Sequence, residues 1–159
     1  MPKKCHQARL DFRHLPVDLG GKLERAKPLR NPHLSEALRK FTGEFRLFVQ
    51  DCAWRLDADK MICSSKTPNA NDGQMVLGLR TLIDQRVVNA VTTLPAYDLL
   101  IEFSTGAKLR LFCDCFDDGS DGNNYSFHAP ERVFVVKAGG ILTSESRRRE
   151  SFSQSGMSH

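Results

Sequence analysis

Long apolar segments are missing from this sequence of 159 residues. No run approaches the roughly 18 apolar residues of a membrane-spanning helix, and residues 1–12, MPKKCHQARLDF, lack the apolar stretch of a signal peptide. The five cysteines, an odd number, are therefore expected to be reduced thiols rather than a disulfide framework. These features predict a cytoplasmic protein that does not enter a membrane.

Catalytic and metal-binding motifs are scarce. The sequence has no G-x-S-x-G nucleophile elbow and no Walker or G-x-G-x-x-G loop. Cys113 and Cys115 are separated by one residue, whereas zinc knuckles place about two to four residues between their cysteines. We therefore expect no enzymatic activity and no cofactor. A zinc- or cysteine-dependent enzyme that uses Cys113, Cys115 and His128 is kept as an alternative.

Net charge is low but uneven along the chain. The formal net charge is +4, and residues 1–33 hold eight Lys and Arg against three acidic residues. Residues 34–142 hold twelve basic and fourteen acidic residues. A slightly acidic domain with a basic N-terminal segment is suited to electrostatic selection of a partner.

The acidic side chains gather in a polar loop that contains Asp117, Asp118 and Asp121. This loop does not fit the spacing of a calcium-binding EF-hand, because Gly119 and His128 stand where oxygen ligands are required. We expect the three aspartates to contact another protein, one with a basic surface.

The basic N-terminal segment supports an alternative, which is nucleic-acid binding. Such binding would be unspecific and dependent on salt, because Phe12 is the only aromatic residue available there for base stacking. The residues expected to contact phosphate are Lys3, Lys4, Arg9 and Arg13.

Residues 97–114 carry the clearest structural signal. Leu99, Ile101 and Phe103 fall on one face of the first run, and the other face holds Asp98, Leu100 and Glu102. In the second run Leu109 and Leu111 alternate with Lys108 and Arg110, and Ser104-Thr105-Gly106 separates the two runs. A period of two that is interrupted by a glycine turn predicts a β-hairpin.

The rest of the chain is assigned from caps, apolar stripes and breaks. Helices are expected from Asn31-Pro32 to Gly43 and from about Asn71 to Ile83. The expected strands cover residues 45–56, 60–65, 86–94, 125–128, 132–137 and 141–143. A weak echo between the two halves, each with a helix, a strand and a hairpin, suggests an internal duplication.

These elements predict three parts. Residues 1–30 form a basic, partly ordered arm, residues 31–143 form one α+β domain, and residues 144–159 form a disordered tail. In the domain, a curved, mostly antiparallel sheet of about eight strands packs its apolar face on two short helices. The predicted core residues are Leu38, Phe41, Trp54, Leu56, Leu79, Leu82, Val91, Leu99, Ile101, Phe103, Leu109, Leu111 and Val135.

About 90 residues, within about 54–143, resemble a family of small uncharacterised bacterial domains. Such domains are often encoded in gene neighbourhoods of the toxin–immunity and defence kind. The resemblance implies a fold and supplies no catalytic residues. The matching segments are Trp54-Arg55-Leu56, residues 62–65, residues 82–91, residues 98–109, Asn124-Tyr125-Ser126-Phe127 and residues 136–142.

We therefore predict a non-catalytic protein-interaction module, immunity-like or associated with defence. Short strands near the C-terminus would leave a sheet edge open, so a homodimer is a further arrangement that the sequence allows.

Overall fold

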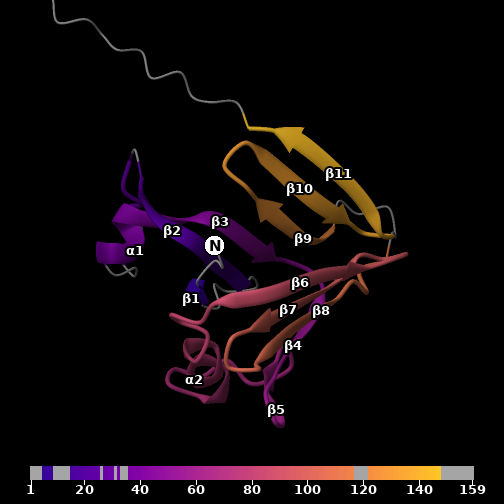
Figure 1. Ribbon diagram of the computed structural model, residues 1–159, viewed down its shortest axis with the longest axis horizontal. Coiled ribbons are helices and arrows are strands. Elements are labelled where there is room, and N and C mark those ends of the chain that lie inside the picture. Colours follow the sequence, from indigo (N-terminus) through magenta and orange to yellow (C-terminus); the bar gives the residue numbers. More distant parts are fainter. Residues whose placement is uncertain are drawn as a thin grey trace, which may run out of the picture.

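The computed structural model describes residues 5–8, 15–25, 27–30, 32, 36–116 and 122–147, without the side chains of residues 5–8 and Leu38. Strands dominate this part of the chain (Figure 1). In chain order the elements are β1 (Cys5–Ala8), β2 (Leu15–Glu24), α1 (Glu36–Lys40), β3 (Phe41–Val49), β4 (Ala53–Asp57), β5 (Met61–Ser64), α2 (Gln74–Arg80), β6 (Val87–Thr93), β7 (Asp98–Phe103), β8 (Lys108–Phe112), β9 (Asn123–His128), β10 (Arg132–Lys137) and β11 (Ile141–Ser146).

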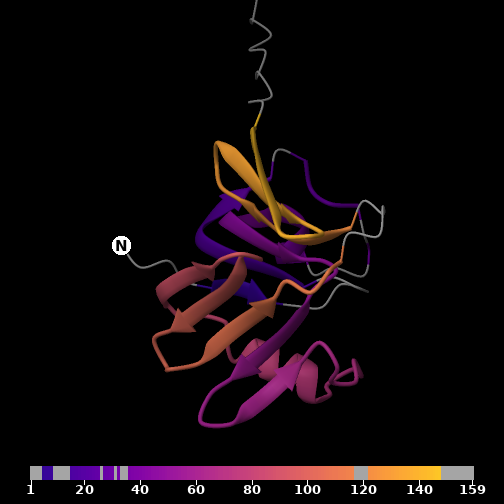
Figure 2. The same cartoon turned by 90° about the vertical axis from the view of Figure 1, so that its right-hand side faces the viewer.

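The strands form two sheets rather than the single sheet that we predicted. One has six strands in the order β1-β2-β3-β9-β10-β11, and the other has five in the order β5-β4-β8-β7-β6. All the pairings are antiparallel, as expected. Figure 2 shows the two sheets one above the other. The buried apolar side chains of both sheets and of α2 form one core cluster.

The division into two sheets arises at residues 50–52. We predicted one strand over residues 45–56 with a bend near Gln50-Asp51, but the chain leaves the six-stranded sheet there and begins β4 in the other. The predicted hairpin is confirmed as β7 and β8. Gly106 in its turn has φ +87°, a conformation that glycine adopts without steric cost.

Among the described residues α2 is the one helix that covers a sheet, so the prediction of two packed helices is wrong. The helix α1 has only five residues, and Phe41 and Gly43 belong to β3. A Cβ on Gly43 would lie 2.9 Å from the backbone nitrogen of Leu19. Gly43 therefore permits close approach of β2 and β3 and does not end a helix. By contrast, α2 packs on β5 through buried residues that include Met75 and Leu79.

Part of the segment that we assigned to an arm belongs to the sheet. Leu15, Val17 and Leu19 on β2 are buried, and β2 lies between β1 and β3. The domain therefore begins before residue 31. At the other end, β11 continues to Ser146, past the predicted boundary at residue 143. The suggested duplication would relate β3 to β6, the strands that follow the two predicted helices, and these lie in different sheets. The duplication stays a prediction.

Most of the predicted core is confirmed, with three corrections. Phe41 and Val91 are exposed, and Val135 is only half-buried, because these side chains lie on outward sheet faces. Leu99 is partly buried and packs on the core. The confirmed buried residues are Trp54, Leu56, Leu79, Leu82, Ile101, Phe103, Leu109 and Leu111.

Candidate binding cleft

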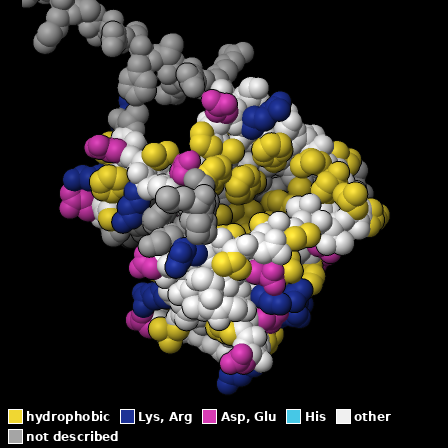
Figure 3. Space-filling model, viewed as in Figure 1, with side chains coloured by type: hydrophobic (Ala, Val, Ile, Leu, Met, Phe, Trp, Pro, Cys, Tyr) yellow, Lys and Arg dark blue, Asp and Glu magenta, His cyan; other side chains and the backbone are white. Residues whose placement is uncertain are grey.

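An apolar cleft of about 470 Å³ opens between the two sheets. Figure 3 shows hydrophobic side chains gathered around this hollow on the face that is viewed. None of the residues that line it carries a charge at neutral pH. They are Leu19, Phe45, Val87, Ala90, Thr92, Tyr97, Leu99, Ile101, Tyr125, Phe127, Phe134, Val136 and Leu142.

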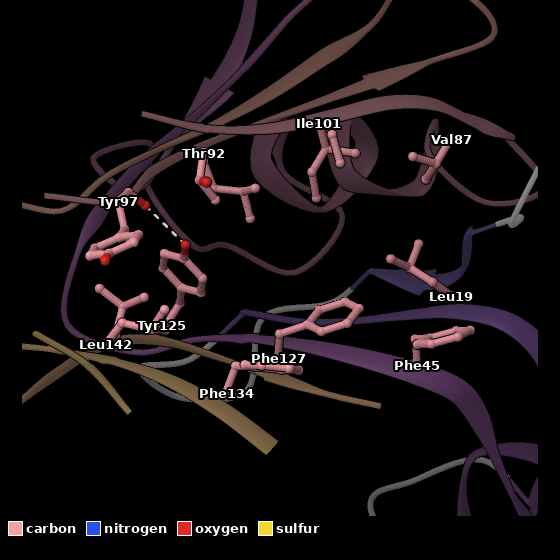
Figure 4. A pocket seen from close by; sticks show the side chains of 13 residues that line it. Leu19, Phe45, Val87, Thr92, Tyr97, Ile101, Tyr125, Phe127, Phe134 and Leu142 are labelled. Carbon is pink, nitrogen blue, oxygen red and sulfur yellow. Dashed lines mark hydrogen bonds between the residues drawn. The ribbon is translucent and has the colours of Figure 1, made fainter. Parts of the chain in front are cut away.

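Both sheets contribute their facing side chains to the cleft (Figure 4). On β9, Tyr125 and Phe127 stand two residues apart and therefore share a face. Ala90 and Thr92 do the same on β6, where a register irregularity near Asn89 also turns Val87 toward the cleft. The walls are thus a direct product of strand alternation.

One wall is stiffened by paired aromatic rings. The rings of Phe45 and Phe127 are stacked, with centroids 5.8 Å apart and planes 19° from parallel. Offset stacking of this kind contributes about 0.5–1.5 kcal/mol beyond area burial. The two rings hold β3 and β9 in register on this side of the cleft.

At the end of the cleft near Tyr97, the buried hydroxyl of Tyr125 has a hydrogen-bond partner within the protein. The hydroxyl of Tyr125 donates a hydrogen bond of 2.9 Å to the backbone carbonyl of Tyr97, as Figure 4 shows. Burial raises the pKa of the Tyr125 hydroxyl above its usual value, so it stays a neutral donor. This hydrogen bond links β9 to the turn that precedes β7.

The cleft is bordered by an open sheet edge. β6 is the last strand of the five-stranded sheet, and it pairs only with β7 among the described residues. Its sequence, VVNAVTT, contains no charged residue and no proline. Natural proteins protect exposed edges with charges, prolines or bulges; β6 has a register irregularity between Val87 and Asn89, and the rest of its edge carries neither a charge nor a proline.

The sites predicted from charge lie outside the residues that the structure describes. This holds for the proposed protein-contact residues Asp117, Asp118 and Asp121. It holds equally for the proposed phosphate-contact residues Lys3, Lys4, Arg9 and Arg13. Both hypotheses stay predictions.

The alternative zinc or cysteine site is not assembled. Within the described residues no group of three or more His, Cys, Asp or Glu side chains could hold a metal ion. The backbone nitrogen of Cys115 donates to the Asn124 side chain near the start of β9, and His128 stands at the end of that strand. Four residues of strand span roughly 13 Å, so the spacing along β9 keeps His128 away from the two cysteines.

His128 instead takes part in a small polar cluster beside β3 and β11. Its Nε2 lies 3.0 Å from the Ser126 hydroxyl, and its Nδ1 lies 3.4 Å from a guanidinium nitrogen of Arg147. Burial, together with the positive charges of Arg147 and Arg46, lowers the pKa of the His128 imidazole. The folded protein therefore favours the neutral ring.

This environment predicts a loss of stability on acidification. The unfolded chain takes up the His128 proton near pH 6.5, whereas the folded protein resists protonation until a lower pH. Above both pKa values His128 is neutral in both states and does not affect the stability. The stability falls as the pH drops through the range between the unfolded and the folded pKa of His128. In urea unfolding at about pH 7.5 and about pH 5.5, His128→Gln should show a smaller fall than the unaltered protein. Equal falls in both proteins would contradict the assignment.

Comparison with protein-family models, curated proteins and solved structures gives no match. In the described part of the chain, no helix has both the length and the apolar character needed to cross a membrane. The proposed resemblance to immunity-like bacterial domains accordingly stays a prediction.

The cleft was not predicted from the sequence, although the sequence contains one signal for it. Tyr125, Phe127, Phe134 and Val136 are large apolar residues at alternate positions of two short strands. That pattern indicates a buried face, yet these side chains do not fill the space between the sheets. Which faces stay open depends on how far apart the sheets lie, and alternation does not encode that distance.

Proposed function

We propose that this protein is a non-catalytic protein-interaction module that binds an extended apolar segment of a partner protein. The observation that carries the proposal is the uncharged cleft between the sheets, with the open edge of β6 alongside it. Immunity-like and defence-associated roles, which rest on the resemblance alone, are consistent with such a module.

The shape of the site favours a peptide over a compact small molecule. Ala90 and Thr92 occupy alternate positions on β6, and their side chains line the cleft. Their backbone N–H and C=O groups face away from β7, because β7 bonds to the intervening residues of β6. An added strand could pair with those groups and direct every second side chain into the cleft. This binding mode is β-strand addition.

Chemical character supports the same occupant. The cleft lining offers few polar groups to orient a small polar ligand, and the hydroxyl of Tyr125 is already bonded to Tyr97. A peptide backbone would obtain its hydrogen bonds from the edge of β6 and its apolar contacts from Phe127 and Leu142. The expected partner segment therefore has apolar residues at alternate positions.

A peptide selection tests this proposal. Phage-displayed random peptides of about the seven-residue length of β6 would be selected on the full-length protein. Enriched peptides are expected to carry apolar residues at alternate positions. Ala90→Arg should weaken the binding of an enriched peptide by about tenfold or more, because it places an unpaired charge in the apolar cleft.

Val91→Arg is the matched control. Val91 is the next residue on the same strand, is exposed, and does not line the cleft, so this variant should bind the peptide as the unaltered protein does. Peptides that bind Ala90→Arg undiminished would overturn the proposal. So would a selection that enriches no peptide while the dye 8-anilinonaphthalene-1-sulfonate binds in the cleft, because that result would identify a small-molecule site.

A further inference from the structure

Two cysteines stand where the chain passes between the sheets. The chain leaves the six-stranded sheet after β3, passes through Cys52 and enters β4; it leaves β8 at Cys113 and returns to β9. The two crossings lie side by side. The backbone nitrogen of Ala53 donates to Asp114 Oδ1 at 3.1 Å, and that of Gln50 donates to the Asn124 carbonyl at 3.0 Å.

The strand register places Cys52 directly opposite Cys113. The last pair of the β4–β8 ladder is Ala53 with Phe112, and the two cysteines are the next pair outward. The backbone nitrogen of Ser65 donates to the Trp54 carbonyl, so Trp54 faces β5 and Ala53 faces β8. By alternation, Cys52 and Cys113 occupy a non-hydrogen-bonded position of the ladder.

That position has the dimensions of a disulfide. In non-hydrogen-bonded antiparallel pairs the Cα atoms are about 4.5 Å apart, within the roughly 4.4–6.8 Å that disulfides span. The two side chains lie on the same face of the ladder, the face of the paired residues Trp54 and Leu111. The register alone brings these two sulfurs together, and Cys115 lies two residues beyond this position.

The two thiols differ in exposure, and this sets the order in which they react. Cys52 is 6% exposed, whereas Cys113 is half-buried. The hydrogen bond with Cys113, and then burial, raise the pKa of the Cys52 thiol. Cys113 is therefore the thiol that meets an oxidant, and Cys52 reacts only with the neighbouring sulfur.

We propose that Cys52 and Cys113 are a redox-sensitive pair that a peroxide converts into an intramolecular disulfide. The Cys113 thiolate attacks one oxygen of hydrogen peroxide, and the O–O bond breaks to give a Cys113 sulfenic acid and hydroxide. Hydroxide takes the proton lost by Cys113 and leaves as water. The Cys52 sulfur then attacks the Cys113 sulfur, the S–O bond breaks, and the departing oxygen leaves as water with the Cys52 proton.

The step balances without any further reactant. Two thiols lose two electrons and two protons, and one hydrogen peroxide molecule becomes two water molecules. A dithiol reductant reverses it by thiol–disulfide exchange.

Oxidation acts on the end of the binding cleft. The Cys113 Sγ lies 3.4 Å from the Tyr97 carbonyl and donates to it, and the same carbonyl accepts the hydrogen bond of Tyr125. A disulfide removes the thiol proton from that contact and ties the two crossings together. The redox state of the pair thus bears on the turn at Tyr97, independently of which ligand the cleft takes.

Mass spectrometry of the intact, full-length protein tests the pair. Reduced protein treated with a small excess of hydrogen peroxide should lose about 2 Da as a monomer, and dithiothreitol should restore the original mass. Trypsin digestion without reduction should then give one linked species that joins peptide 47–55, which contains Cys52, to peptide 111–132.

Three variants identify the sulfurs. Cys115→Ser is the matched control, because peptide 111–132 also contains Cys115; it should keep the link. Cys113→Ser should lose the link, and Cys52→Ser should lose it while Cys113 becomes reactive toward dimedone as a sulfenic acid. A link that Cys115→Ser abolishes, a link between molecules, or dimedone labelling of the unaltered protein without any link would each overturn the proposal. The mass loss and the linked peptide species are measured on the unaltered protein, so a variant that fails to fold does not affect that result.

Discussion

Arg46→Met is expected to lower the free energy of unfolding by about 3–5 kcal/mol, because it leaves a buried carboxylate without its counter-charge. The Asp18 side chain is 5% exposed, and Arg46 Nε lies 2.8 Å from its Oδ1. A second guanidinium nitrogen lies 3.4 Å from Oδ2, which makes the pair bidentate. Asp18 and Arg46 face each other in the β2–β3 ladder, so no other strand position offers a replacement. Urea unfolding of the variant and the unaltered protein gives the difference.

A double variant separates the ion pair from the packing of the arginine stem. Asp18→Leu combined with Arg46→Met removes both charges and should recover most of the lost stability, since a buried pair replaced by apolar side chains is often neutral or stabilising. Failure of this recovery would show that the Arg46 stem or its contact with the Thr42 hydroxyl carries the effect.

Arg55→Met is the control for a more exposed pair. Arg55 is 42% exposed and lies 2.9 Å from Asp57, which also has Arg110 at 3.4 Å. Loss of a solvent-accessible pair of this kind costs about 0–1 kcal/mol. Equal losses in Arg46→Met and Arg55→Met would contradict the argument that the burial of Asp18 decides the effect.

Local patterns in the sequence predicted the local structure. The hairpin of β7 and β8 was found because Leu99, Ile101 and Leu109 recur with a period of two around a glycine turn. Each of these signals, the period of two and the glycine turn, comes from residues that are close in the chain. Antiparallel pairing through short turns follows from the same information, and the structure confirms it.

Long-range pairing could not be read in the same way. Leu15, Val17 and Leu19 alternate as a strand should, but Pro16 and the glycines at 20 and 21 made the segment resemble an arm. β2 is stable because β3 pairs along its length, which is a contact between distant segments. Gly43 was assigned to a helix end for the same reason, because its neighbour in space is Leu19 and not the preceding turn.

The candidate site shows the same limit more sharply. Its lining comes from β2, β3, β6, β7, β9, β10, β11 and the turn at Tyr97, so no short motif contains it. The opposition of Cys52 and Cys113 likewise depends on the β4–β8 register. The spacing of Cys113 and Cys115 drew attention in the sequence, whereas the pair that the fold brings into contact is 61 residues apart, as the difference of 113 and 52 gives.

Phe103→Ala should be the most destabilising change in the hairpin, with a loss of about 3–5 kcal/mol in the free energy of unfolding. Phe103 is 1% exposed, and it lies at the end of β7 between Val87 of β6 and Ala107. Both neighbours are smaller than the ring that is removed. The ladder hydrogen bonds hold the backbone in place, so the cavity cannot close and the loss exceeds the transfer free energy of the ring.

Phe112→Ala offers a matched comparison, because the same residue type is removed from the partner strand of the same hairpin. Phe112 is 37% exposed and contacts the Arg55 guanidinium 5.6 Å above its ring. The loss there should be about 1 kcal/mol, the size of one exposed cation–π contact with some apolar area. Urea unfolding followed by the fluorescence of Trp54, the only tryptophan, measures both. Similar losses in the two variants would mean that the interior of the five-stranded sheet can relax around a missing ring. Fast hydrogen exchange from Leu99 to Phe103 should then accompany these losses, because a sheet that rearranges so readily would also open its backbone to water.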